Sequence, residues 1–210
     1  MPSDSPALAD LGGLWRRTLY VGPDRREDRE SAVWWLQAGA LCGDIRAPRP
    51  GAPAETAFAV RLETDGDIFG WRFEQSVGYP PDAPPDEGRL RWEGDALRED
   101  GVHIPYVELW RRDPAPIRRA GRFPGGLLIE IGPFGFCARD GRFLLAERGP
   151  EGWTTVLCAA ADSAPGAAVG WPGVEGGVIR FPEGPLGPKT VHSFTETPFH
   201  TANPVSTPTL

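Results

Sequence analysis

The sequence predicts an all-β protein, because short apolar segments with a period of two recur along the chain and turn-forming residues separate them. Gly (27) and Pro (24) are abundant, yet eight Trp and ten Phe argue against disorder, since a disordered chain has no core for aromatic side chains. A Gly-x-Trp opening at Gly13–Trp15 is typical of a first strand whose Trp plugs one end of a small up-and-down barrel.

The first half contains seven strand candidates, several joined by residues that tolerate positive φ. Asp65-Gly66, Gly94-Asp95 and Asp100-Gly101 favour tight hairpins and therefore sequential antiparallel pairing. Residues 26–40 also admit an amphipathic helix, but Val33 and two adjacent Trp favour a strand. The expected strands are Leu14–Val21, Ala32–Gln37, Leu41–Arg46, Ala57–Glu63, Asp67–Val77, Gly88–Trp92 and Val102–Arg111.

The Pro- and Arg-rich stretch 111–126 reads as a connector between two halves, which suggests domains at 1–115 and 116–195 and a Pro/Thr-rich tail at 196–210. The halves suggest either two small barrels or two faces of one sandwich, and other Pro-rich stretches, at 46–50 and 79–85, read as loops or a strap. The second half has strand candidates Leu127–Gly132, Phe134–Arg139, Arg142–Glu147, Trp153–Ala160, Ala167–Trp171, Val178–Phe181 and Thr190–Phe194.

Charge and composition exclude several classes of function. A formal charge of −7 disfavours nucleic-acid binding, which needs clustered Lys and Arg. The start has no signal peptide and no long apolar run follows, so we expect no membrane partner. Three widely spaced Cys favour a reducing compartment and a cytoplasmic location. No zinc-ligand spacing, dinucleotide fingerprint or phosphate-binding loop occurs in the sequence, so we expect no metal and no cofactor.

Several motifs in the first half resemble the Hri-type family of fungal and bacterial proteins. They are GLWRR at Gly13–Arg17, VWWLQ at Val33–Gln37, DIRAP at Asp44–Pro48, EGDAL, and EDGVHIPYVELWRR up to Arg112, with a weaker echo at Gly125–Phe143. The resemblance implies two tandem small calycin (lipocalin-like) antiparallel β-barrels. It implies architecture and carries over no catalytic residues, because a shared fold does not define a shared chemistry.

The segment Tyr106–Trp110 contains the main candidates for chemistry. Its period of two places Tyr106, Glu108 and Trp110 on one face. If that face is interior, Glu108 needs a cationic partner, because a buried unpaired carboxylate is costly, and Arg46 or Arg72 is the expected one. A structural ion pair is one interpretation.

The functional interpretation makes Glu74 and Glu108 a pair of pocket carboxylates that act with Tyr106 as catalytic groups, should the protein be an enzyme. Asp44 shares a strand face with Arg46, as does Arg72 with Glu74. The aromatic residues among the candidates would form either a pocket wall or plain core. The expected ligand-binding residues are Trp35, Gln37, Arg46, Trp71, Arg72 and Trp110.

Three classes of function follow. The first is binding of a small apolar or amphipathic molecule in the N-terminal barrel. The alternative is a cofactor-free isomerase, cyclase or hydrolase that uses Glu74 or Glu108 as general base. The third is an interaction scaffold or homodimer that docks through apolar patches between the halves.

Overall fold

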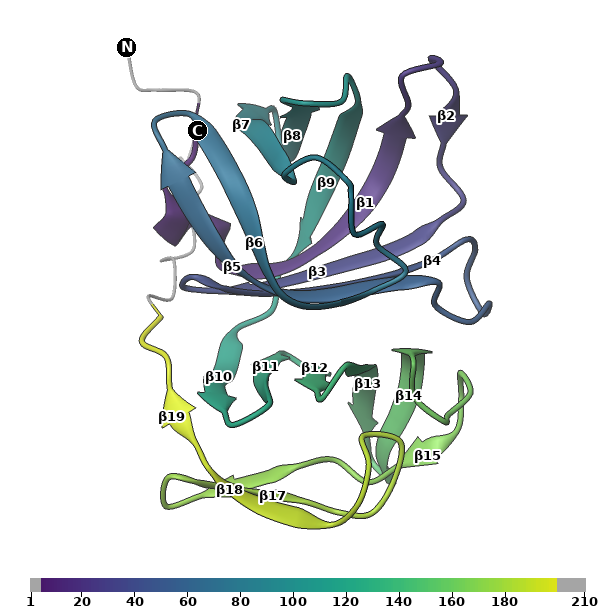
Figure 1. Cartoon of the computed structure of the whole chain (residues 1–210), viewed down its shortest axis with the longest axis vertical. Coiled ribbons are helices and arrows are strands. Elements are labelled where there is room, and N and C mark those ends of the chain that lie inside the picture. The colour runs from purple at the N-terminus through teal and green to yellow at the C-terminus, as the bar shows by residue number, and fades with distance from the viewer. Residues whose placement is uncertain (1–4, 200–210) are drawn as a thin grey trace, which may run out of the picture.

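A computed structural model describes residues 5–199, and it confirms the all-β class. Apart from a short 3-10 helix, η1 (Leu8–Leu11), the regular elements are strands (Figure 1). The strands of the first half are β1 (Gly13–Val21), β2 (Glu27–Asp28), β3 (Ala32–Ala38), β4 (Leu41–Ala47), β5 (Thr56–Asp65), β6 (Ile68–Val77), β7 (Glu87–Glu93), β8 (Ala96–Gly101) and β9 (Val107–Asp113).

These strands form a closed antiparallel barrel of eight strands. The order is β2-β1-β3-β4-β5-β6-β7-β8-β9, and β9 pairs back onto β1 from Leu14↔Asp113 to Val21↔Val107. The short β2 adds to the outer end of β1. Two predicted hairpin turns contain glycines at positive φ, Gly66 at 62° and Gly94 at 65°, which explains why glycine occupies both positions.

Trp15 plugs one end of this barrel, as the Gly-x-Trp opening predicts. Its side chain is fully buried, stacks on Trp35 with ring centres 5.6 Å apart, and donates a hydrogen bond from Nε1 to the carbonyl oxygen of Leu11 at 2.8 Å. Because Leu11 belongs to η1, this bond holds the short helix at the same end of the barrel. The other end is therefore the one that can hold polar groups or a ligand.

The second half is built from two smaller sheets. A seven-stranded sheet has the order β15-β14-β13-β12-β11-β10-β19, and a three-stranded sheet has the order β16-β17-β18. The chain passes between the sheets at both edges, from β15 to β16 and from β18 to β19, so the strands follow one another in an up-and-down ring without a continuous ladder. The strands are β10 (Ile117–Phe123), β11 (Gly126–Ile131), β12 (Phe134–Arg139), β13 (Arg142–Gly149), β14 (Gly152–Ala159), β15 (Ala168–Val169), β16 (Gly173–Glu175), β17 (Val178–Phe181), β18 (Thr190–Ser193) and β19 (Thr195–Glu196).

The halves share one apolar core. The outer face of β3, β4 and β5 packs on the seven-stranded sheet, whose opposite face is covered by β17 and β18 (Figure 1). The closest approach is at Gly43, where an added Cβ would lie 2.2 Å from the ring of Phe136. The apolar faces between the halves are therefore buried against each other and do not form the docking surface that the scaffold hypothesis requires.

Residues 32–38 form β3, so the favoured strand interpretation of this segment is confirmed. The structure differs from the sequence expectations in other places. Asp100 and Gly101 end β8 and form no tight hairpin, because the chain turns at residues 102–106 before β9. Strand β8 was not expected, and the stretch read as a connector contains β10. Strand β19 crosses the expected start of the tail at residue 196, and residues 200–210 of that tail lie outside the described residues.

Candidate functional site

The barrel wall is open between β6 and β7. Strand β6 has ten residues but pairs with β7 at only three positions, from Ile68↔Arg89 to Gly70↔Glu87. One further backbone hydrogen bond, from Trp71 N to Asp86 O at 2.9 Å, lies at the end of this ladder. The intervening segment, residues 78–86, contains four prolines, which have no N–H to donate to a neighbouring strand, so it leaves the sheet. We call residues 78–86 the strap.

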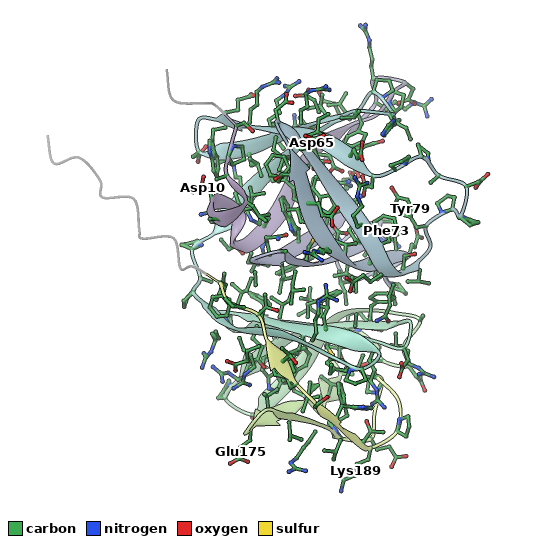
Figure 2. The ribbon with its side chains drawn as sticks, turned by 60° about the vertical axis from the view of Figure 1, so that its left-hand side comes forward. Asp10, Asp65, Phe73, Tyr79, Glu175 and Lys189 are labelled. Carbon is green, nitrogen blue, oxygen red and sulfur yellow. The ribbon has the colours of Figure 1, made fainter. Side chains whose placement is uncertain are left out.

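A cavity of about 420 Å³ lies between β6 and the strap. This volume falls within the range of small-molecule sites. The rings of Phe73 and Tyr79 are perpendicular with centres 4.5 Å apart, and Figure 2 shows these two side chains next to each other at the edge of the barrel. The walls of the cavity include Trp71, Phe73, Tyr79, Pro81, Ala83 and Asp86. The cavity is thus an aromatic groove with a carboxylate in its wall.

Behind this cavity lies a network of buried charges from β1, β4 and β9. Arg17 donates from Nη1 to Glu108 Oε1 at 2.6 Å, and Arg46 donates from Nε to Asp44 Oδ1 at 2.7 Å. A longer contact of 3.9 Å joins Arg46 Nη1 to Glu108. The side chains of Glu108 and Asp44 are each only 4% exposed, so both carboxylates are shielded from water, whereas the Arg46 side chain is 28% exposed. Burial raises the pKa of Asp44, and Arg46 opposes that rise.

Glu99 of β8 is the third buried carboxyl group. It accepts hydrogen bonds from the Tyr106 hydroxyl at 2.5 Å and from Trp110 Nε1 at 3.1 Å. Burial raises the pKa of Glu99 well above its usual range, and the neighbouring charge of Glu108 raises it further. Tyr106 and Trp110 thus share an interior face with Glu108, as the period of two predicts, but both bind Glu99.

Asp86 is the carboxylate nearest to solvent, because it also forms part of the cavity wall. Burial raises its pKa to about 6, Arg46 lowers it, and Glu108 and Asp44 raise it. The neighbouring Tyr79 hydroxyl also lowers the pKa of Asp86. In turn, burial and the charge of Asp86 raise the pKa of Tyr79 to about 12. Among the described residues, no Arg, Lys or His nitrogen lies within ion-pair distance of Asp86.

The interior therefore has more acidic than basic groups. Four carboxyl groups and two guanidinium groups share it: Asp44, Asp86, Glu99, Glu108, Arg17 and Arg46. The two guanidinium groups are matched by the carboxylates to which they bind most closely. This leaves Glu99 and Asp86 without a cation, and the raised pKa values of both follow from their burial first and from this excess second.

The other expected ligand-binding residues separate into two groups. Trp71 lines the cavity and Arg46 lies behind it. Trp35 and Gln37 instead belong to the plugged end, where Trp35 Nε1 donates to Gln37 Oε1 at 2.9 Å and Gln37 Nε2 donates to the carbonyl oxygen of Gly39 at 2.6 Å. Both side chains are almost completely buried and hydrogen-bonded within the core.

The structure does not bring Glu74 and Glu108 together. Glu74 lies on the outer face of β6 and binds Arg122 of the second half, with Nη2 to Oε1 at 2.7 Å. Glu108 lies among the interior charges, whereas Glu74 lies where the β5–β6 register shifts and its side chain is directed outward to the second half. Glu74 therefore connects the halves.

Arg72 is not the partner of Glu108. It lies on the outer face, where Nη2 contacts Glu87 at 2.8 Å and Nε contacts Glu63 at 3.5 Å, although its side chain also borders the cavity. Arg46 contacts Glu108 only weakly, and the strong partner is Arg17. The Arg16-Arg17 pair contained the signal for this, because adjacent residues of a strand face opposite sides and one Arg of the pair must point inward.

Sequence reasoning missed Tyr79, Asp86 and Glu99. Tyr79 and Asp86 bound the Pro-rich strap, which the sequence identifies only as a loop. Glu99 lies in ALREDG, where Leu97 is the one apolar side chain in the barrel core, which is too little to mark a strand. A charged residue at an interior position interrupts the alternation on which strand prediction depends.

A second cavity, of about 270 Å³, lies where β3 of the barrel meets β14. Its charged wall residues, Arg16 and Arg17, are already engaged. The Arg16 guanidinium carbon is 3.7 Å from the centre of the Trp34 ring and its Nε is 2.7 Å from Asp113, while Arg17 pairs with Glu108. This cavity is smaller and has no carboxylate in its wall. It is the weaker candidate for a binding site.

Within residues 5–199, no helix has the length and apolar character to cross a membrane, and no group of three or more His, Cys, Asp or Glu side chains is arranged to hold a metal ion. No family model matches the chain, and no curated protein matches it. One solved structure with a similar fold is that of an uncharacterized protein, YLR301w, from Saccharomyces cerevisiae. It is 14% identical, the match covers 90% of this chain and 98% of the yeast chain, and the TM-score is 0.56. At this identity the likeness shows the fold alone.

Proposed function

We propose that the protein binds a small amphipathic molecule in the cavity between β6 and the strap. The observation that supports this most strongly is the local opening of an otherwise closed barrel at that position, where three aromatic side chains and one carboxylate line a cavity of about 420 Å³. A barrel needed only as a scaffold would gain stability from continuing the β6–β7 ladder. The apolar rings supply contact area, and the polar groups fix orientation.

The geometry favours binding over catalysis. Glu74 lies outside the barrel, and Glu108 is held by Arg17, so neither carboxylate borders the cavity as a free general base. Catalysis by Glu74, Glu108 and Tyr106 acting together finds no support in this arrangement.

The test is a titration with two neutral amphipathic probes, N-phenyl-1-naphthylamine and 4-phenylbutan-1-ol, followed by Trp fluorescence and thermal shift. We expect saturable binding and a raised melting temperature, because a ligand that binds only the native state stabilises it. Filling the cavity with Ala83→Phe should abolish both effects. The absence of saturable binding to the wild type would refute the proposed function.

Two tryptophan variants locate the response. Trp71 lines the cavity, whereas Trp92 stacks near Trp15 at the plugged end, with ring centres 6.1 Å apart. Trp71→Phe should remove most of the probe-induced fluorescence change, and the matched Trp92→Phe should preserve it. The reverse pattern would place the probe elsewhere in the molecule.

Two broader proposals depend on independent features. Membership of the Hri-type family is supported by the motifs in residues 13–112 and by the barrel that these residues form. A cytoplasmic location is supported by Cys42, Cys137 and Cys158, all of them free and buried, as expected for thiols kept reduced.

A further inference from the structure

The cavity wall has a definite charge character, which bears on the chemical class of its ligand. Asp86 is the acidic group in the wall, and the two guanidinium groups behind it, Arg17 and Arg46, are matched by Glu108 and Asp44. Arg46, the nearest interior cation, is bound to Asp44 through two hydrogen bonds, from Nε at 2.7 Å and from Nη2 at 3.2 Å. The interior therefore offers Asp86 little neutralisation.

A single cationic side chain, Arg72, borders the same cavity in the described structure and could favour an anion instead. Its guanidinium is engaged by two carboxylates, Glu87 at 2.8 Å and Glu63 at 3.5 Å, and its side chain is half exposed. Its charge is therefore both neutralised and screened by solvent. An anionic ligand would have to compete with these two carboxylates while facing Asp86.

The aromatic walls, like Asp86, favour a positively charged ligand. The faces of Trp, Tyr and Phe rings attract cations, with an attraction of about 0.5 to 2 kcal/mol that grows as water is excluded. Trp71, Phe73 and Tyr79 line the cavity together with Asp86. A carboxylate beside three aromatic rings is an arrangement suited to an ammonium group attached to an apolar body.

We propose that the ligand is a cationic amphipathic molecule, an organic amine whose ammonium group pairs with Asp86 while its apolar body lies against Trp71, Phe73 and Tyr79. This inference rests on the proposed function and specifies its ligand class. It gives the excess interior carboxylate a role, because the bound amine supplies the cation that the protein lacks there.

The experiment compares three probes with the same phenylbutyl body: 4-phenylbutylamine, 4-phenylbutan-1-ol and 4-phenylbutanoate. Calorimetry on the full chain at about pH 7 should show the amine binding roughly tenfold more tightly than the alcohol, and the carboxylate binding most weakly. Asp86→Asn should reduce the amine to the affinity of the alcohol and leave the alcohol unchanged. Asp82→Asn, an exposed change in the same strap, should preserve the preference.

A pH series on the wild type tests the same point without a variant. The pKa of Asp86 is about 6. The titratable and charged groups facing it are Cys42, Asp44 and Arg46 from β4, Glu99 from β8, Glu108 from β9, and the two tyrosines Tyr79 and Tyr106. An ammonium group favours the ionised carboxylate, so binding releases protons. The preference for the amine should therefore weaken as the pH falls from about 7 to about 5.

The outcomes separate the two proposals. Equal affinity for amine and alcohol, or an amine preference that survives Asp86→Asn, would overturn the charge assignment while leaving the cavity as a binding site. Tightest binding of the carboxylate would overturn it as well and point to Arg72. Failure of all three probes to bind would overturn the proposed function itself.

Discussion

Arg17 is the residue on which the polar end of the barrel depends most. It points inward from β1, is 9% exposed, and contacts both Glu108 at 2.6 Å and Asp28 at 3.1 Å. Removing one partner of a buried ion pair leaves the other charge uncompensated. The free energy lost in this way is larger than the free energy gained by forming the pair. Arg17 is therefore needed because the carboxylates are present.

Arg17→Met should lower the free energy of unfolding by about 3 to 5 kcal/mol at neutral pH, since it leaves Glu108 buried beside other carboxyl groups without its closest cation. Arg111→Met is the matched control, because Arg111 forms an exposed pair with Asp95 and its loss should cost under about 1 kcal/mol. Urea unfolding measures both. Equal losses of unfolding free energy would show that the interior pair contributes no more to stability than the exposed pair.

Asp86 makes stability depend on pH. Its pKa rises from about 4 in the unfolded chain to about 6 in the folded one, so the native state holds the proton more tightly. The stability associated with this group is complete below the unfolded value and is lost as the pH rises through about 6.

Asp86→Asn removes that loss. The variant should gain on the order of 2 to 3 kcal/mol over the wild type between about pH 4 and about pH 7, as expected for a shift of this size. Chemical unfolding across this range measures the difference between the two proteins. A constant difference at every pH would contradict a desolvated, titrating Asp86.

At the scale of elements, β4 is the strand that joins the two cores. Its inward positions carry Cys42, Asp44 and Arg46 into the barrel, and its outward positions pack on the second half. Gly43 is the contact point, because Phe136 of β12 occupies the space that a side chain would need. The glycine is thus required by a close approach and not by a turn.

Gly43→Ala should destabilise the protein by about 1 to 3 kcal/mol, the usual range for overpacking a filled core. Combining it with Phe136→Leu should restore part of the loss, so the two substitutions should be non-additive. Gly173→Ala, with nothing within 4 Å of its added Cβ, is the control and should have little effect. Fully additive losses would argue against the Gly43–Phe136 contact.

The elements show how far the sequence can predict this fold. Strands that are mostly apolar and buried on both faces, such as β3 and β12, are predicted within a residue or two. Strand β10, IRRAGRF, is not, because its Arg-rich outer face and the flanking prolines hide the inward Ala120. The site is harder still to predict: period two places Glu108 and Trp110 on one face, but only the fold shows that this face is interior, which Arg reaches Glu108, and that the strap brings Asp86 to the cavity.

At the scale of the whole molecule, we expect the halves to act as one folding unit because, besides the core within each half, they share an apolar core at their junction. The shared core contains residues from β3–β5 and from β10–β14 that are at most 8% exposed. Separating the halves would expose this surface, at about 25 cal/mol for each Å² of apolar area. Glu74 with Arg122 and Gln75 with Gly125 and Gly141 add polar contacts across the junction.

We therefore expect one cooperative unfolding transition. Amides of β4 and β12 should exchange with the same opening free energy as denaturant is added, since local opening of either strand would break the shared core. Hydrogen exchange followed by mass spectrometry measures this. Exchange of β12 at markedly lower denaturant than β4 would show that the second half unfolds separately.

The central claim is that the opening between β6 and the strap binds an amphipathic cation. The most direct measurement is a crystal structure of the full chain soaked with 4-phenylbutylamine. Our account predicts density for the phenyl ring against Phe73 and Tyr79, with the ammonium nitrogen within hydrogen-bond distance of Asp86. A cavity that excludes the probe, or density with the amine directed to solvent away from Asp86, would contradict it.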